Sequence, residues 1–374
     1  MFNSTDHNTS DSQGNVGYRY YFFEPSFMYP VCAVYILIAI IAALGNLAVV
    51  FTILANRSLR SNTTYLYLLS LAISDLITAT MAMPFDIEYI FQQSVWKHEA
   101  SLCVAFYTAW YITVPTSIFT LLAIGVDRFL SLRDPMRQYR RSQFSTKRSC
   151  LIVIITIWIY SIIWALLPVM GWHVKGREPV QWDMCMVPFT KVYFAVSTLL
   201  NFVAPLLISC VFFILAFVIA YKHQRNKQIL GTFGSQRHDS KQTRFFAKHL
   251  KATKTTLMFL AAFFFCWQPY SYFSIASNLY GGRHWNPYPY KVYVLLLMFG
   301  YLNCALNPFL FAFRNEHFRS TSMKFIRSLK LGANPKRSSI RRPSTISTQS
   351  SSSVIPENDS KEIRLQSVRK KSED

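Results

Sequence analysis

The chain has 374 residues, of which 52% are hydrophobic and 16% aromatic, and it carries a formal net charge of +21 at pH 7. Its mean hydropathy is +0.21, which is too apolar for an ordinary soluble protein of this length. The composition therefore argues against a soluble enzyme and for a membrane protein.

Seven apolar stretches are each long enough to cross a bilayer, which takes about 20 mostly apolar residues. One such stretch alone would fit a buried helix of a large soluble protein. Seven with short connections predict an all-α membrane protein, a seven-transmembrane helix bundle over residues 29–313. In chain order the predicted spans are Tyr29–Leu54, Tyr65–Phe91, Leu102–Leu132, Cys150–Met170, Val192–Tyr221, Thr255–Leu279 and Tyr290–Phe313.

Most of the 39 lysines and arginines follow the first, third, fifth and seventh spans, so they lie on one side of the bundle. Basic residues concentrate on the cytoplasmic side of membrane proteins. We therefore expect a multi-pass protein of the plasma membrane with its N-terminus outside. The basic charge is explained by this topology and by attraction to anionic inner-leaflet lipid, so nucleic-acid binding is not expected.

Both ends of the chain lie outside the predicted bundle. Residues 1–28 are expected to be extracellular without a cleaved signal peptide, because no basic segment precedes an apolar core. Asn3 and Asn8 begin glycosylation sequons there. Residues 314–330 are amphipathic and predict a short helix that lies on the inner membrane surface and contacts lipid.

Residues 331–374 are rich in serine and in basic side chains, and we expect a disordered cytoplasmic tail. The tail is either a polar linker or a phosphorylation substrate, with Ser344 and Thr345 as candidate sites. Each phosphate would add about −1.5 to −2 charge at pH 7 and so create a site for a basic partner.

Two of the seven cysteines are expected to face an oxidising compartment. Cys103 opens the third span at its outer end, and Cys185 lies in the outer loop between the fourth and fifth spans. A disulfide between them would pin this loop across the mouth of the bundle. The other five cysteines lie in or at the ends of helices, where cysteine behaves as a small apolar residue.

Polar side chains at membrane depth are candidates for function, because their burial in hydrocarbon is costly. Asp75 lies in the second span, Ser117 in the third, and Asn303 and Asn307 in the seventh. A ring of oxygens around Asp75 would suit a small hard cation such as Na⁺. Alternatively, these groups only hydrogen-bond across helices. No other cofactor is expected.

The third span carries one stripe of notable residues from end to end. Helical periodicity places Trp110, Ser117 and Arg128 on nearly the same face. Asp127 and Arg128 stand at its cytoplasmic end, where an immersed arginine costs about 2.5 kcal/mol or more. Such a costly arginine beside an acid indicates a functional pair.

Together these motifs resemble the rhodopsin-like (class A) G-protein-coupled receptors over roughly residues 30–327, and they occur in order on the expected spans. They are Gly45-Asn46, Leu71-Ala72-Ile73-Ser74-Asp75, Trp96 with Cys103, Asp127-Arg128-Phe129, Trp158, Pro205, Phe263 with Cys266-Trp267-Gln268-Pro269, and Asn307-Pro308-Phe309-Leu310-Phe311. Two loop segments, 134–139 and 168–172, are most similar to the adenosine and amine receptor group.

The resemblance implies a receptor that transduces an extracellular small-molecule signal to heterotrimeric G proteins, and not an enzyme. Arg128 would leave Asp127 on activation and contact the G protein, and Met136 would insert into it as an apolar plug. Trp267 would be the moving aromatic beneath the ligand. The resemblance also implies activation roles for Asn307 and Pro308, an allosteric sodium site at Asp75, Ser117, Asn303 and Asn307, the Cys103–Cys185 disulfide, and arrestin binding to the phosphorylated tail.

Three positions depart from the family pattern. Phe213 and Phe311 stand where the family usually has tyrosines, whose hydroxyls help hold the active state. His249 stands near the place of an acid that locks the arginine in many inactive members. The loss of the two tyrosine hydroxyls at Phe213 and Phe311 weakens the active state. The loss of the locking acid near His249 weakens the inactive state.

The ligand is less well defined by the sequence. Tyr301 replaces the retinal-binding lysine of opsins, Trp110 the aspartate of amine receptors, and Ser274 the asparagine of adenosine receptors. The sequence therefore supports neither an opsin nor an ordinary amine or adenosine receptor. The predicted ligand pocket consists of Asp86, Trp110, Ser197, Asn201, Trp267, Tyr270, Ser274 and Tyr301.

An aromatic box with one carboxylate suits a small cation. Asp86 is eleven residues beyond Asp75 and is expected to face inward and replace the missing counter-ion. Alternatively, Asp86 and Glu88 are both solvated at the mouth of the helix. Two other functions stay open, namely a constitutively active orphan receptor and a receptor for a peptide or lipid.

Overall fold

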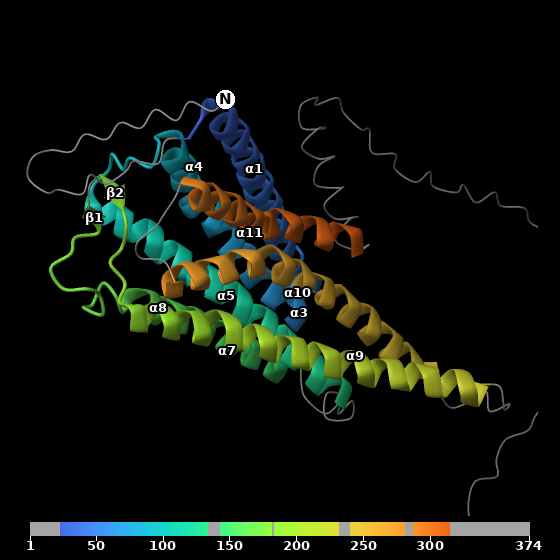
Figure 1. Cartoon of the computed structure of the whole chain (residues 1–374). Coiled ribbons are helices and arrows are strands. Elements are labelled where there is room, and N and C mark those ends of the chain that lie inside the picture. Colours follow the sequence, from blue (N-terminus) through green and yellow to red (C-terminus); the bar gives the residue numbers. More distant parts are fainter. Residues whose placement is uncertain (1–22, 134–142, 182, 232–239, 281–286, 315–374) are drawn as a thin grey trace, which may run out of the picture. The chain divides into compact units, whose positions relative to one another are not determined.

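The computed structural model describes residues 23–133, 143–181, 183–231, 240–280 and 287–314. Within these ranges the chain is almost wholly helical, with one antiparallel pair of short strands at the end that we call the outer end (Figure 1). The elements are α1 (Pro25–Ala55), α2 (Arg57–Arg60), α3 (Thr63–Ile77), the π-helix η1 (Thr78–Ala82), α4 (Met83–Phe91), α5 (Ala100–Arg133), α7 (Gln143–Leu166), β1 (Val180–Gln181), β2 (Met184–Cys185), α8 (Lys191–Thr198), the π-helix η2 (Leu199–Val203), α9 (Ala204–Gly231), α10 (Ser240–Tyr280) and α11 (Pro287–Arg314).

Six helical segments of the described chain are long and apolar enough to cross a membrane, and they match predicted spans one to five and seven. The sixth predicted span lies in α10, which is long enough to cross a membrane but is less apolar than the other six. Its sequence mixes tyrosines, serines and Gln268 with apolar residues. Because α10 still packs between α9 and α11, the predicted helix bundle is confirmed.

α5 is the central helix of the bundle, since it packs against α3, α7, α9 and α10 (Figure 1). α1 packs against α3 and α11. The largest fully buried side chains include Trp267, Tyr301, Phe213 and Phe263. The outward faces of α1, α7 and α9 instead expose large aliphatic side chains, as expected of helices that face lipid.

α1 and α11 approach each other closely at Gly45. A Cβ atom added to Gly45 would lie 2.7 Å from Cγ of Pro308. Any larger residue would therefore force the two helices apart, and glycine is required here by the contact.

Two predicted spans contain π-helical turns that the sequence patterns did not reveal. η1 ends two residues before Pro84, and η2 ends two residues before Pro205. Proline has no N–H group for the regular helical ladder. In both places the next N–H bonds five residues back, from Met83 to Thr78 and from Ala204 to Leu199. The wider turn changes which side chains face inward beyond it.

The inner ends of two spans are longer than predicted. α9 continues to Gly231 and α10 begins at Ser240, because lysine, glutamine and alanine favour helix beyond the apolar stretch. α7 ends earlier than predicted, at Leu166, ahead of Pro168.

Several predicted features lie outside the described residues and stay predictions. These are the sequons at Asn3 and Asn8, the apolar plug Met136, the surface helix from residue 315 onward, and the tail with Ser344 and Thr345.

Candidate functional site

The outer mouth of the bundle is fixed by the predicted disulfide, which joins Cys103 at the start of α5 to Cys185 on β2. Both cysteines are buried together with Trp96. Further along the loop, the ring of Phe189 packs against Tyr111 of α5, with 5.0 Å between ring centroids. The loop is thereby held across the outer half of α5.

A cavity lies between α5, α8, η2 and α10, with an empty volume of about 520 Å³ including its open side. Five of the eight predicted pocket residues line it, namely Trp110, Ser197, Asn201, Tyr270 and Ser274. The amide N–H of Asn201 donates to Ser197 Oγ at 3.3 Å, while Asn201 Oδ1 is buried without a hydrogen-bond partner. A ligand with an N–H or O–H group would satisfy this oxygen.

Trp267 lies beneath the cavity and does not line it. Only 1% of its surface is exposed, and its ring makes edge contacts with Trp110 and Tyr270 at centroid distances of 5.9 and 5.8 Å. On the other side, a Cβ added to Gly300 would lie 3.0 Å from the ring. A ligand in the cavity would therefore act on Trp267 through Trp110 or Tyr270.

Asp86 and Tyr301 also lie outside the cavity lining and form a pair of their own. The Tyr301 hydroxyl donates to Asp86 Oδ2 at 2.6 Å. Tyr301 is fully buried and Asp86 is half-buried. The carboxylate also interacts electrostatically with Tyr107, Tyr270 and Tyr293. Asp86 thus faces into the bundle among tyrosines, as expected. Because the π-helical turn η1 lies between Asp75 and Asp86, regular helical spacing does not explain this orientation.

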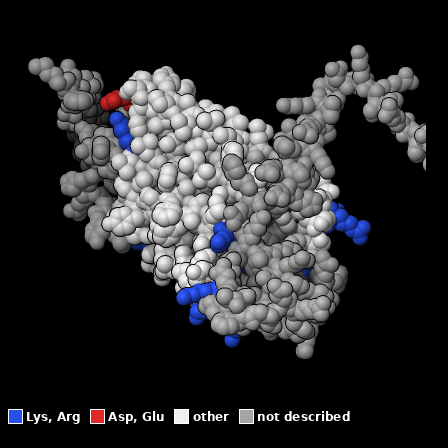
Figure 2. Space-filling view, turned by 90° about the vertical axis from the view of Figure 1, so that its right-hand side faces the viewer, with Lys and Arg blue, Asp and Glu red and all other residues white. Residues whose placement is uncertain are grey.

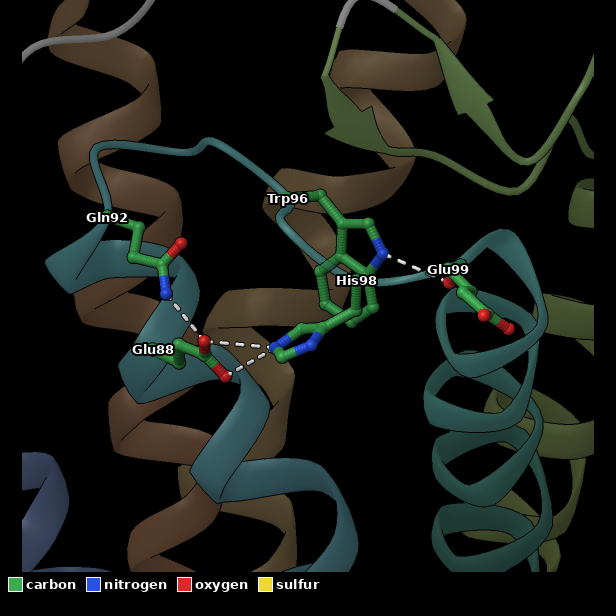
Figure 3. Close-up of polar contacts among 5 residues, drawn as sticks. All are labelled: Glu88, Gln92, Trp96, His98 and Glu99. Atoms are coloured by element: carbon green, nitrogen blue, oxygen red, sulfur yellow. Dashed lines mark hydrogen bonds and ion pairs between the residues drawn. The ribbon is translucent and has the colours of Figure 1, made fainter.

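Glu88, the second acid of α4, lies instead at the outer surface. Figure 3 shows its carboxylate between Gln92 and His98, with Nε2 atoms at 2.5 and 2.9 Å. The side chains of Glu88 and His98 are 37% and 35% exposed. The two acids therefore differ in environment, and only Glu88 matches the alternative of a carboxylate at the solvated mouth.

The four predicted sodium ligands are all buried, and two of them, Asp75 and Asn307, are in contact. Asn307 Nδ2 donates to Asp75 Oδ2 at 2.6 Å, and Ser117 Oγ is 2.9 Å from Ser74 Oγ. Asn303 Oδ1 is buried without a hydrogen-bond partner. Asp75, Ser117 and Asn303 thus offer hard oxygens that fit Na⁺, whereas Asn307 turns a donor toward the carboxylate.

Arg128 is buried at the inner end of α5. Its Nη2 group donates to Asp127 Oδ2 at 2.6 Å and to Thr64 Oγ1 of α3 at 2.5 Å. The Asp127 pairing is the one that the motif predicts. Thr64 was not a predicted partner, and its hydrogen bond connects the guanidinium to α3.

The two phenylalanines that replace the family's tyrosines are both buried. Phe213 packs where α9 meets Gly125, and a Cβ added to that glycine would lie 3.1 Å from the ring. Phe311 makes an edge contact with Phe259 of α10 at 5.2 Å. Both rings are therefore part of the packing between helices, with no hydroxyl to hold water.

These features agree with comparisons against known proteins. A profile of the family described as 7 transmembrane receptor (rhodopsin family) matches residues 45–311. The chain belongs to this family. It is accordingly a G-protein-coupled receptor that passes a small-molecule signal to heterotrimeric G proteins.

Similar proteins include several amine receptors. The receptor is 29% identical to the histamine H2 receptor of Cavia porcellus over 78% of its own length and 77% of that protein's. It is 27% identical to the 5-hydroxytryptamine receptor 4 of the same species, covering 75% of each chain. It is 26% identical to the octopamine receptor beta-2R of Chilo suppressalis, covering 77% of each.

The structure adds residues that sequence reasoning did not find. Tyr111, Phe194, Phe202 and Ser271 also line the cavity. Phe202 lies within η2, so simple helical periodicity counted from Ser197 does not place it correctly. Only the proline spacing common to both π-helical turns gives a signal for this shift.

Proposed function

We propose that this receptor is activated by a small cationic ligand whose positive charge is bound by Asp86. The observation that carries the proposal is the position of this carboxylate, which faces into the bundle, accepts a hydrogen bond from Tyr301 and stands among further tyrosines. A carboxylate beside several aromatic faces attracts a cation by charge and by cation–π interaction.

The cavity supplies the remaining recognition in this proposal. An aromatic group of the ligand would pack against Trp110 and Tyr270, both of which line the cavity. A donor on that group would meet Asn201 Oδ1. The named relatives are receptors for histamine, 5-hydroxytryptamine and octopamine, which are small amines with an aromatic ring. In this receptor Asp86 takes the part of the aspartate that Trp110 replaces.

The test is G-protein activation in cells by a panel that includes these three amines. We expect at least one to activate the receptor and Asp86→Asn to lower its potency about tenfold or more, because a buried charge pair loses one partner. Glu88→Gln is the matched control, since this acid pairs with His98 outside the tyrosines. Full potency in Asp86→Asn would remove the proposal, and Arg128→Ala should abolish every response.

We further propose that the receptor lies in the plasma membrane with the disulfide end outside. Figure 2 faces the side opposite β1 and β2 of Figure 1, and among the described residues it shows separate lysine and arginine side chains, with acidic side chains only at its upper left edge, beside a basic one. This distribution supports a cytoplasmic location for that side. Arrestin binding to the tail, lipid contact of residues 314–330, and Na⁺ at Asp75 are further proposals that follow from the family.

A further inference from the structure

The chain immediately before α1 is tied into the outer end of the bundle. Phe23 is only 4% exposed, although it precedes the helix. Its N–H donates to Gln93 Oε1 at 2.5 Å, and its carbonyl accepts from Gln93 Nε2 at 3.1 Å. One side-chain amide therefore satisfies both backbone groups of Phe23, which removes the need for a neighbouring strand or water.

The turn after α4 has an unusual backbone that aims two side chains at this segment. Gln93 and Ser94 have φ angles of 57° and 66°. Two consecutive non-glycine residues in the left-handed region are strained, and such strain persists where the surrounding structure holds it. Ser94 is 1% exposed and its Oγ donates to the Tyr290 hydroxyl at 3.2 Å.

An unbroken series of aromatic contacts leads from Phe23 toward the centre of the receptor. Phe23 stacks on Tyr290 of α11 at 5.4 Å and 15°, and Tyr290 stacks on Tyr293 at 5.9 Å and 8°. Tyr293 contacts Tyr270 of α10 at 5.4 Å, and their hydroxyls are 3.2 Å apart. Tyr270 in turn contacts Trp267 at 5.8 Å. We call these five residues the aromatic column.

A weaker contact supports the same arrangement. Lys291, next to Tyr290 on α11, lies 3.9 Å from Glu24 and 5.4 Å from the Phe27 ring centroid. Glu24 is largely exposed, and exposed ion pairs of this kind stabilise little. The buried contacts of Phe23 with Gln93 and Tyr290 therefore carry the attachment.

We propose that Phe23 and Gln93 form an outer clamp that holds the aromatic column, and with it Trp267, in the resting arrangement. The clamp joins the chain before α1, the turn after α4 and the outer half of α11. Release of Phe23 would free the top of the column and allow Tyr293, Tyr270 and Trp267 to rearrange. A residue that precedes the first helix thus sets the basal level of G-protein signalling.

The test is ligand-free G-protein activation at matched surface expression. We expect Phe23→Ala and Gln93→Asn to raise basal activation about threefold or more, because each removes buried contacts made by the resting state. Asparagine tolerates a positive φ and keeps the amide, but it is too short to bond both backbone groups of Phe23. Tyr29→Ala is the control, since Tyr29 is exposed and its ring lies beside that of Phe91, outside the aromatic column. It should keep wild-type basal activation.

A second pair of variants tests the route through the column. Tyr293→Phe keeps the ring and loses the hydroxyl contact with Tyr270, so a smaller rise is expected. Phe23→Ala combined with Tyr293→Phe should signal no more than Phe23→Ala alone, because coupled sites are not additive. Fully additive effects would refute the column as the route.

Wild-type or reduced basal activation in both Phe23→Ala and Gln93→Asn overturns the proposal. If Phe23→Ala does not reach the cell surface, the proposal is tested with Gln93→Asn and Tyr293→Phe instead. Unchanged basal activation in both of these variants overturns the proposal and means that the attachment of Phe23 is only structural. Arg128→Ala in the Phe23→Ala background should return activation to background, which shows that the signal comes from the receptor.

Discussion

The hydrogen bond between Arg128 and Thr64 predicts that loss of the Thr64 hydroxyl raises basal signalling. We propose, from the family resemblance, that Arg128 leaves its partners on activation and contacts the G protein. In this structure those partners are Asp127 on the same helix and Thr64 on α3. The change to test is Thr64→Val, which has nearly the same shape and lacks the hydroxyl.

The size of the effect follows from the kind of bond that is lost. A hydrogen bond to a charged group contributes about 1.5–3 kcal/mol, and each 1.4 kcal/mol corresponds to about tenfold in an equilibrium constant. Arg128 is buried, its side chain being 8% exposed, so water replaces the lost acceptor poorly. Because Asp127 still holds the same Nη2 group, we expect the lower end, about a tenfold rise in the active fraction.

The assay is G-protein activation without ligand, per receptor at the surface, for wild type, Thr64→Val and Thr64→Ser. The serine variant keeps a hydroxyl and should stay near wild type, and Thr63→Val on the same turn is the positional control. Equal basal activation in Thr64→Val and wild type, with Asp127→Asn clearly raised, would show that Thr64 does not restrain the arginine.

Three further outcomes are expected. Gly300→Ala should raise basal activation, because its Cβ would lie 3.0 Å from the Trp267 ring and must displace it; an unchanged basal level would contradict this account. Phe213→Tyr with Phe311→Tyr should raise agonist-driven signalling by restoring hydroxyls between the helices, and no change in basal or driven response would count against that role. Replacing Na⁺ by K⁺ in the medium should change wild-type basal activation and leave Asp75→Asn unaffected; equal wild-type responses in both salts would rule out a functional sodium site.

The sequence predicts the features that depend on long apolar runs or on local motifs. Hydropathy alone supports six of the seven predicted spans, and the sixth, in α10, is supported by its packing between α9 and α11. The pairing of Cys103 with Cys185 follows from topology and family resemblance. Each of these is determined by residues close in sequence or by the membrane itself.

Contacts between segments that are distant in sequence cannot be predicted from apolar runs or local motifs. Thr64 and Arg128 are 64 residues apart, and Phe23 and Gln93 are 70 apart. Neither pair follows from periodicity, because each depends on how whole helices pack. The π-helical turn η2 likewise departs from periodicity in the ligand pocket, since the lining residues Asn201 and Phe202 lie within it.

The close approach of Gly45 to Pro308 bears on how the receptor changes shape. α11 has no regular backbone bond to donate at Pro308, so its inner part bends most readily there. Because Gly45 has no side chain, the ring of Pro308 packs directly against the backbone of α1. A bend of α11 at Pro308 would therefore turn about this contact. The backbone of α1 would therefore limit the direction in which the inner end of α11 can bend.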